Sequence, residues 1–247
     1  MKKLAYWGFI VISFFSVSSL KAQDKQQVIN KVWKAVGGKS TFEKSRYLQF
    51  TFALERDGKT LASRDHLWDR YTGDYRFETT DQDGKKTVVL FNINTKKGTA
   101  YQDGTALTGE ANDKMVQKAY ATFINDSYWL MVPLKLQDPG VNTELMPSEE
   151  VNGTKCDIIH LNFDKVGLTP GDQYWLFVND DTGQIIQWKF LLQGQKNSSI
   201  FVWSPYQDLG NGLKLSTKKT NEESKSSIYF PTAKVLASVE QDIFIKP

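Results

Sequence analysis

Hydrophobic and polar residues alternate along much of the chain from Tyr47 onward. Between Tyr47 and Glu55, the positions Leu48, Phe50, Phe52 and Leu54 are apolar and their neighbours are mostly polar. A period of two places all four side chains on one face of an extended strand. The turn sequences "ERDGK", "YTGDY", "DQDGK", "NTKKG" and "YQDG" then follow one another through position 104. This pattern predicts an antiparallel meander.

Two segments follow a helical period instead. Residues 28–36 place Val28, Ile29, Val32, Trp33 and Val36 on one helix face, and Gly37-Gly38 should end that helix. Residues 115–123 repeat the spacing. Asp126 is then expected to begin a separate apolar helix, "SYWLMVPLKL", which stops before Asp138-Pro139-Gly140. Strands should resume after it and continue to the C-terminus.

The segment "YWLFVNDDTGQIIQWKF", residues 174–190, predicts a β-hairpin with its turn at Asp180–Gly183. Counting outward from that turn pairs Val178 with Ile185 and Trp175 with Trp188. One face would then carry Trp175, Phe177, Ile186, Trp188 and Phe190. Exposing five such side chains would forgo about 10 kcal/mol at ~2 kcal/mol each, which is the size of a domain's net stability. Protein or a bound molecule must therefore cover this face.

These elements predict a mainly β (α+β) fold. An antiparallel sheet of about ten strands cannot stay flat, so it should curve strongly into a half-barrel with a few helices covering its concave face. We find no linker or low-complexity tract, and residues 23–247 are expected to form a single domain.

The first 22 residues have the pattern of a secretory signal peptide. Lys2 and Lys3 precede an apolar run, and "SSLKAQ" ends it at Ala22. An uncleaved anchor is the alternative. No cysteine follows the run, which argues against a lipid-modified N-terminus. The mature chain is expected to be periplasmic or secreted.

Composition narrows the classes of partner. The precursor has 31 Lys and Arg against 28 Asp and Glu, and residues 1–22 hold three of the lysines and no acid. The mature net charge is therefore near zero, which argues against nucleic acid or an anionic membrane face as partner. Cys156 is the single cysteine, so no internal disulfide can form. The oligomeric state is left open.

The sequence offers little catalytic chemistry. His66 and His160 are the only histidines and fall on different predicted strands. We expect His66 to bond to Asp65 or Arg64. His160 shares a strand face with Cys156, but a third metal ligand is missing. No metal, cofactor or catalytic residue is predicted, so we expect a protein that is not an enzyme. A hydrolase would need both histidines near a Ser or a carboxylate.

Several segments of the chain resemble a known family. "HLWDRYTGDYRFE", the hairpin at 174–190 and the position of the helical interruption are similar to the periplasmic lipoprotein carriers and receptors of the LolA/LolB type, over most of residues 24–215. "INDSYWLMVPLKLQDPG" resembles a LolA-like group of exported proteins, and Tyr71 stands where the carriers usually have Pro. The resemblance implies a half-barrel closed by inner helices, a hydrophobic cavity that holds acyl chains, and no catalysis.

In such carriers an arginine at the position of Arg70 holds the helical lid shut. Arg70 lies two residues after Trp68, so both should point toward the cavity mouth, where the guanidinium could bond helix-end carbonyls of residues 113–136. A salt bridge with Asp69 or Asp74 is the alternative. The candidate ligand-binding residues are Phe50, Phe52, Trp68, Tyr75, Phe77, Trp129, Leu130, Trp175, Phe177, Ile186 and Trp188.

The expected function is that of a periplasmic binding or carrier protein for a lipid or an acylated molecule, with lipoproteins or another envelope protein as partners. The alternative is a non-enzymatic interaction or scaffold protein of the cell envelope with a fully packed core. A cavity of ~300 to 1,000 Å³ would favour the first.

Overall fold

The structure is a computed structural model that describes residues 15–164 and 171–247, with side chains from Asp24 onward. Its helices are α1 (Phe15–Ala35), α2 (Lys39–Lys44), α3 (Gly109–Met131) and the 3-10 turn η1 (Val132–Leu134). The strands of the first half are β1 (Tyr47–Arg56), β2 (Lys59–Asp69), β3 (Asp74–Thr80), β4 (Lys86–Asn92), β5 (Lys97–Gln102) and β6 (Thr105–Ala106). Those of the second half are β7 (Val141–Val151), β8 (Thr154–Phe163), β9 (Gln173–Asn179), β10 (Ile185–Leu191), β11 (Ser199–Trp203), β12 (Tyr206–Asp208), β13 (Lys214–Ser216), β14 (Lys218–Asn221), β15 (Ser226–Tyr229) and β16 (Ala233–Leu236).

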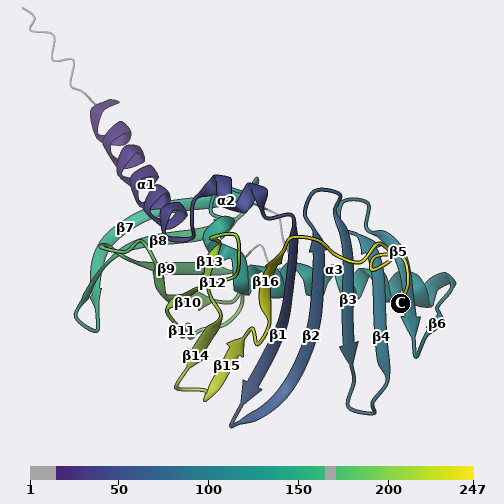
Figure 1. Cartoon of the computed structure of the whole chain (residues 1–247). Helices are drawn as coiled ribbons and strands as arrows, with labels where there is room; N and C mark the ends of the chain where they lie inside the picture. Colours follow the sequence, from purple (N-terminus) through teal and green to yellow (C-terminus); the bar gives the residue numbers. More distant parts are fainter. Residues whose placement is uncertain (1–14, 165–170) are drawn as a thin grey trace, which may run out of the picture.

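Fourteen strands form one open antiparallel sheet in the order β6-β5-β4-β3-β2-β1-β15-β14-β11-β10-β9-β8-β7, with β16 also paired to β1. Strands β12 and β13 form a separate pair. In Figure 1 strands β7 to β10 run across the direction of β1 to β5, and α3 passes behind β1 to β5. The predicted fold class is confirmed. The large sheet has more than the ten strands predicted, because the chain after β10 forms several short strands of three to five residues.

Helix α1 ends where the glycine pair predicts. Gly37 has φ +101°, and a Cβ there would lie 2.2 Å from the carbonyl oxygen of Gly212, so a larger residue would force the loops apart. The inner face of α1 packs on β8 and β9 through Val28, Ile29 and Val32. The signal-peptide prediction falls on residues 1–22, of which 1–14 lie outside the described part, and it stays a prediction. Among the described helices, none is both long and apolar enough to cross a membrane.

Helix α3 is continuous, which corrects the predicted break. Asp126 does not begin a second helix; it lies in the last third of α3 and is fully buried. Its side chain is satisfied by tertiary partners from the sheet rather than by a helix N-terminus. The position of Asp126 in the sequence suggested a helix cap, but the residue forms a long-range ion pair with Arg64 instead.

The hairpin register was predicted correctly only next to the turn. Val178 pairs with Ile185, but a β-bulge follows, and Trp188 pairs with Leu176 rather than with Trp175. One extra residue reverses the faces beyond it. The inner face therefore carries Leu176, Val178, Ile185 and Trp188, whereas Trp175, Phe177 and Ile186 pack with Cys156 and Ile158 in a small cluster of their own.

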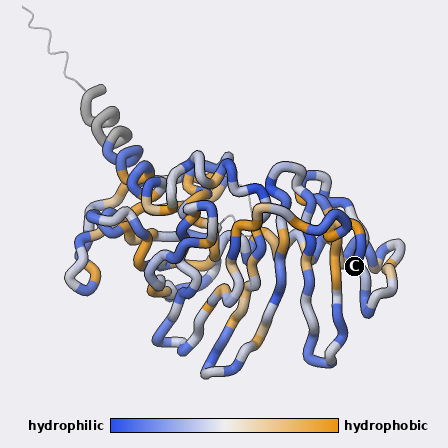
Figure 2. The backbone as a smooth tube through the Cα atoms, viewed as in Figure 1, coloured by the Kyte–Doolittle hydropathy of each residue, from blue (hydrophilic) through white to orange (hydrophobic). Residues whose placement is uncertain are grey.

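Three larger hydrophobic clusters line the inner side of the sheet. One lies between α3 and β3 to β5, one between α3 and the β1/β15 region, and one between α1, η1 and β8 to β10. Figure 2 shows the hydrophobic stretches along strands and helices and mainly hydrophilic residues at the hairpin turns. The helices thus sit where the curved sheet offers its apolar face.

Candidate functional site

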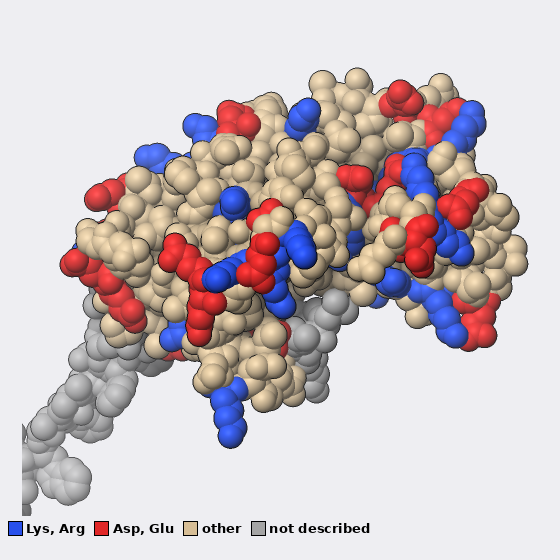
Figure 3. Space-filling model, turned by 90° about the horizontal axis from the view of Figure 1, so that it is seen from below, with Lys and Arg blue, Asp and Glu red and all other residues tan. Residues whose placement is uncertain are grey.

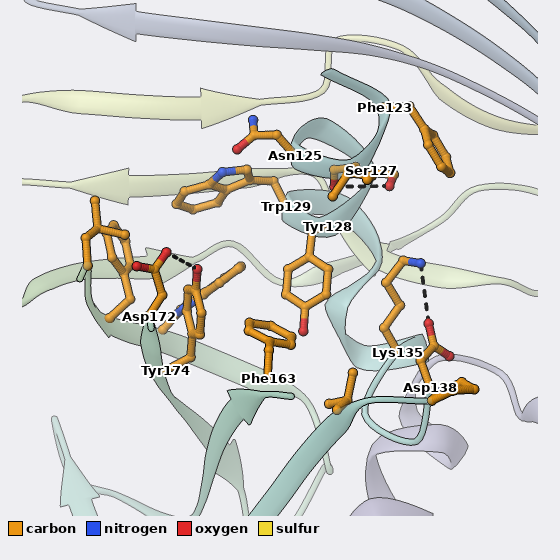
Figure 4. A pocket seen from close by; sticks show the side chains of 16 residues that line it. Phe123, Asn125, Ser127, Tyr128, Trp129, Lys135, Asp138, Phe163, Asp172 and Tyr174 are labelled. Atoms are coloured by element: carbon orange, nitrogen blue, oxygen red, sulfur yellow. Dashed lines mark hydrogen bonds and ion pairs between the residues drawn. The ribbon is translucent and has the colours of Figure 1, made fainter. Parts of the chain in front are cut away.

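A cavity of about 530 Å³ lies between the C-terminal half of α3, the segment after η1, and the ends of β8, β9 and β10 (Figure 4). It is lined by Phe123, Ile124, Asn125, Ser127, Tyr128, Trp129, Lys135, Asp138, Pro139, Val141, Phe163, Asp172, Tyr174, Trp188, Phe190 and Leu192. Most of these side chains are aromatic or aliphatic. Such a lining with a few polar groups is typical of a ligand pocket.

The walls of this cavity are aromatic rings in mutual contact. The ring of Trp188 lies 4.8 Å from Trp129, 5.3 Å from Tyr174 and 6.1 Å from Tyr128, centroid to centroid. The contacts with Tyr174 and Tyr128 are edge-to-face and the contact with Trp129 is tilted, and such contacts hold the rings in fixed positions. The wall is therefore rigid on the sheet side, and α3 supplies the facing side through Tyr128 and Trp129 (Figure 4).

Charged groups stand at two places on the lining. Lys135 Nζ lies 3.5 Å from the carboxylate of Asp138, and both are partly exposed. Asp172 is 1% exposed; its carboxylate accepts a hydrogen bond from the Tyr174 hydroxyl at 3.0 Å and one from the Gln193 backbone N–H at 2.7 Å. The buried carboxylate is thus satisfied by neutral donors from the protein.

Two buried donors on the lining are unsatisfied. The Tyr128 hydroxyl and the Trp188 indole N–H are shielded from solvent and have no hydrogen-bond partner among the described residues. Burial also raises the pKa of Tyr128 far above its ordinary value, so its hydroxyl keeps its proton. Buried polar groups are nearly always hydrogen-bonded. Among the described residues six buried side-chain groups lack a partner, and the groups of Tyr128 and Trp188 are the two on the cavity lining, where an acceptor of a bound molecule could reach them.

Of the eleven residues predicted to bind a ligand, Trp129 and Trp188 line this cavity. The bulge moves Trp175, Phe177 and Ile186 away from the cavity, and all three belong to the separate cluster around Cys156. The remaining candidates, Phe50, Phe52, Trp68, Tyr75, Phe77 and Leu130, pack in the core clusters against α3 and β1 to β5. Tyr128, Phe163 and Tyr174 also line the cavity and are not among the predicted residues. For Tyr128 the sequence holds a signal, since it adjoins Trp129 in an apolar run.

A polar network ties α3 to the sheet behind the cavity. Arg64 donates two hydrogen bonds to Asp126, at 2.6 and 2.8 Å. His66 Nε2 lies 3.1 Å from the same carboxylate, and the Tyr75 hydroxyl lies 2.9 Å from His66 Nδ1. Burial lowers the pKa of His66, so the neutral ring can donate to Asp126 and accept from Tyr75. The predicted partners of His66, Asp65 or Arg64, are wrong.

The Arg70 guanidinium bonds carbonyls at the end of α2 and not those of residues 113–136, so the predicted latch is wrong. Its Nη1 donates to the backbone carbonyls of Phe42 and of Ser45, the latter at 2.7 Å, and its guanidinium lies 3.5 Å from the Phe42 ring centroid. Arg70 directly follows β2, and this end of β2 lies beside the end of α2. It satisfies carbonyls at the end of that short helix. The alternative is also wrong: Asp69 pairs with Arg46 at 2.7 Å, and Asp74 accepts hydrogen bonds from the side chains of Thr72 and Asn92.

The other titratable candidates are engaged elsewhere. His160 Nε2 lies 2.7 Å from the side-chain oxygen of Gln173, and its ring stacks on Trp175. Cys156 is buried. Within the described ranges, no three His, Cys, Asp or Glu side chains gather closely enough to hold a metal ion.

A solved structure shares this fold. A DUF1329 family protein from Desulfovibrio piger superposes with a TM-score of 0.50 at 13% identity, covering 89% of this chain and 96% of that one. The shared feature is the fold. A LolA superfamily protein from Nitrosomonas europaea (TM-score 0.49, 12% identity, 89% and 97% coverage) and a putative outer membrane lipoprotein-sorting protein domain from Vibrio parahaemolyticus (0.48, 7%, 89% and 97%) are also similar.

Sequence comparison adds no closer relative. No family model matches the chain, and no curated protein matches it. The site must therefore be interpreted from its own residues.

Charge on the face drawn in Figure 3 is mixed. Lys and Arg are interspersed with Asp and Glu across that face. This face therefore has no continuous positive patch that would attract a polyanion.

Proposed function

We propose that the protein is a periplasmic or secreted binding or carrier protein for a lipid or an acylated molecule, held in the cavity between α3 and β8 to β10, without catalysis. The observation that carries this proposal is the aromatic cavity of about 530 Å³. This volume falls in the ~300 to 1,000 Å³ range of sites that enclose small molecules. The resemblance of the sequence to LolA/LolB-type carriers points to the same class of ligand.

Burial of apolar surface would drive the binding of a chain in this cavity. A chain lying between Trp129, Phe163 and Trp188 would exchange water for ring faces on both sides, at about 0.8 kcal/mol per buried methylene. The rings are preorganised by their mutual contacts, so little ordering cost remains when a chain enters. An acyl chain therefore fits the cavity by shape and by polarity.

The alternative scaffold function also has an observation in its favour. Six of the eleven predicted lining residues are packed in the core clusters, and Phe50 and Tyr75 are 1% and 0% exposed. Most of the concave face is thus filled by α3 and needs no guest. The cavity of about 530 Å³ lies at the end of the sheet nearest β8 to β10, and the carrier proposal depends on that end alone.

Filling the cavity tests the proposal. Val141 lines the cavity at the start of β7, so Val141→Trp should occupy the space a chain would use. We expect displacement of N-phenyl-1-naphthylamine by C12 to C16 lipids to weaken at least tenfold, with native mass spectrometry of the wild type showing co-purified lipid. The thermal midpoint should change by only a few degrees.

The matched control is Glu144→Trp. Glu144 lies on the same strand, is exposed, and does not line the cavity. It should bind lipids as the wild type does. Wild-type protein that neither carries lipid nor binds the fluorescent probe would contradict the carrier function and leave the scaffold function.

A further inference from the structure

We propose that the ligand is a single-chain molecule with an uncharged acyl carbonyl, an ester or an amide, whose oxygen accepts a hydrogen bond from the Tyr128 hydroxyl inside the cavity. This inference rests on the proposed function and specifies its ligand. It concerns the polar end of the ligand, whereas the proposed function concerns the chain.

The volume of the cavity limits how many acyl chains it can hold. Carbon atoms of a liquid-like chain occupy about 30 Å³ each, similar to a water molecule. The cavity of about 530 Å³ therefore accommodates one chain of ordinary length together with a small linking group. Three chains, as on a triacylated lipoprotein anchor, would need several times that space. The cavity fits a single acyl chain.

The donor is Tyr128. Its hydroxyl is buried and unpartnered, and Figure 4 shows its ring projecting into the cavity between Trp129, Phe163 and Lys135. The Trp188 indole N–H is a second unpartnered donor on the lining, on a residue only 2% exposed. An unmet buried donor is costly, and an acceptor that arrives with the ligand removes that cost. A plain hydrocarbon would leave both donors unmet.

The charges on the lining favour an uncharged acceptor. The lining holds two carboxylates, Asp138 and Asp172, and one amine, Lys135, which is paired with Asp138. A free carboxylate would be desolvated close to two acids without a cation of its own. A cationic head group would meet Asp172, whose oxygens already accept two hydrogen bonds, and would leave Tyr128 unmet. An ester or amide carbonyl accepts from Tyr128 and adds no charge.

Three C12 ligands with different head groups test the inference. 1-Monolaurin carries a neutral ester, laurate a carboxylate, and dodecyltrimethylammonium a cation without an acceptor. In displacement of N-phenyl-1-naphthylamine from the full chain, we expect monolaurin to bind several-fold more tightly than the other two. Tyr128→Phe should weaken monolaurin binding about three- to tenfold, which corresponds to loss of one hydrogen bond, and leave dodecyltrimethylammonium unchanged. Tyr120→Phe, on the same helix away from the cavity, is the control.

A spectroscopic measurement separates bonding from packing. The infrared band of a ¹³C-labelled ester carbonyl should shift to lower frequency when monolaurin binds the wild type, and the shift should be absent in Tyr128→Phe. Equal weakening of all three ligands in Tyr128→Phe, an unshifted carbonyl band, or tighter binding of laurate than of monolaurin would overturn the inference while leaving a lipid-binding function intact. Failure of all three ligands to bind the wild type would overturn the proposed function itself.

Discussion

Asp126→Ala is expected to destabilise the protein by about 3 to 5 kcal/mol, because it removes the shared partner of Arg64 and His66 in the interior. Asp126 is fully buried, His66 is 1% exposed, and Arg64 bonds the carboxylate through two nitrogens. Without the carboxylate, the guanidinium loses its counter-charge and the imidazole its acceptor. The free energy of unfolding from urea titration measures the loss.

The control for this variant is Asp113→Ala on the same helix. Asp113 is exposed, and among the described residues its carboxylate accepts a single long hydrogen bond, from Asn112 at 3.3 Å, so its removal should cost well under 1 kcal/mol. If Asp126→Ala costs no more than Asp113→Ala, the network does not hold α3 on the sheet.

Lys219→Met is expected to raise stability at neutral pH, by about 1 to 3 kcal/mol. Lys219 is 0% exposed; its amine donates to the Ser216 carbonyl and lies 4.6 Å from the Trp203 ring and 4.9 Å from the Phe230 ring. Burial lowers the pKa of Lys219 well below its ordinary value; ring faces attract an ammonium, but desolvation opposes the charge more strongly. Met has a similar shape and packs well against aromatic rings.

The pH dependence identifies the cause. Since the pKa of Lys219 is lower in the folded state, the unfolded chain binds more protons between that pKa and about 10.4, and this group makes stability rise with pH across that window. Below the folded-state pKa of Lys219 the amine is protonated in both states, so this group no longer changes stability with pH and the cost of burying its charge is complete. Urea unfolding of the wild type from pH 7 to 10 should show this rise, and Lys219→Met should lack it. Lys218→Met, the exposed neighbour, should keep the wild-type slope; identical slopes in all three proteins would show that Lys219 does not titrate in this way.

The sequence was most informative where local rules decide the structure. Turn residues with positive φ, such as Asp57 and Gly58 between β1 and β2, lie where the pattern predicted turns. Alternation along β1 correctly placed Leu48, Phe50 and Phe52 inside. These features depend on neighbours within a few residues, so the meander and the curved antiparallel sheet could be predicted.

The site was less predictable because it depends on long-range and fine geometry. One bulge after Ile185 exchanges the faces of the hairpin, and no turn residue signals it. Asp126 resembles a helix cap in sequence, and its partner Arg64 is 62 residues away. A cavity is the space that large side chains fail to fill, so its place among Tyr128, Phe163 and Trp188 emerges only from packing.

A crystal structure with a brominated ligand would show whether an acyl chain occupies this cavity. The protein would be crystallised with a 1-monoacylglycerol that carries bromine at the end of its chain, and the bromine located by anomalous scattering. We expect a peak inside the cavity enclosed by Tyr128, Phe163 and Trp188. A peak at the cluster around Cys156, or between α3 and β3 to β5, with the cavity empty, would contradict it.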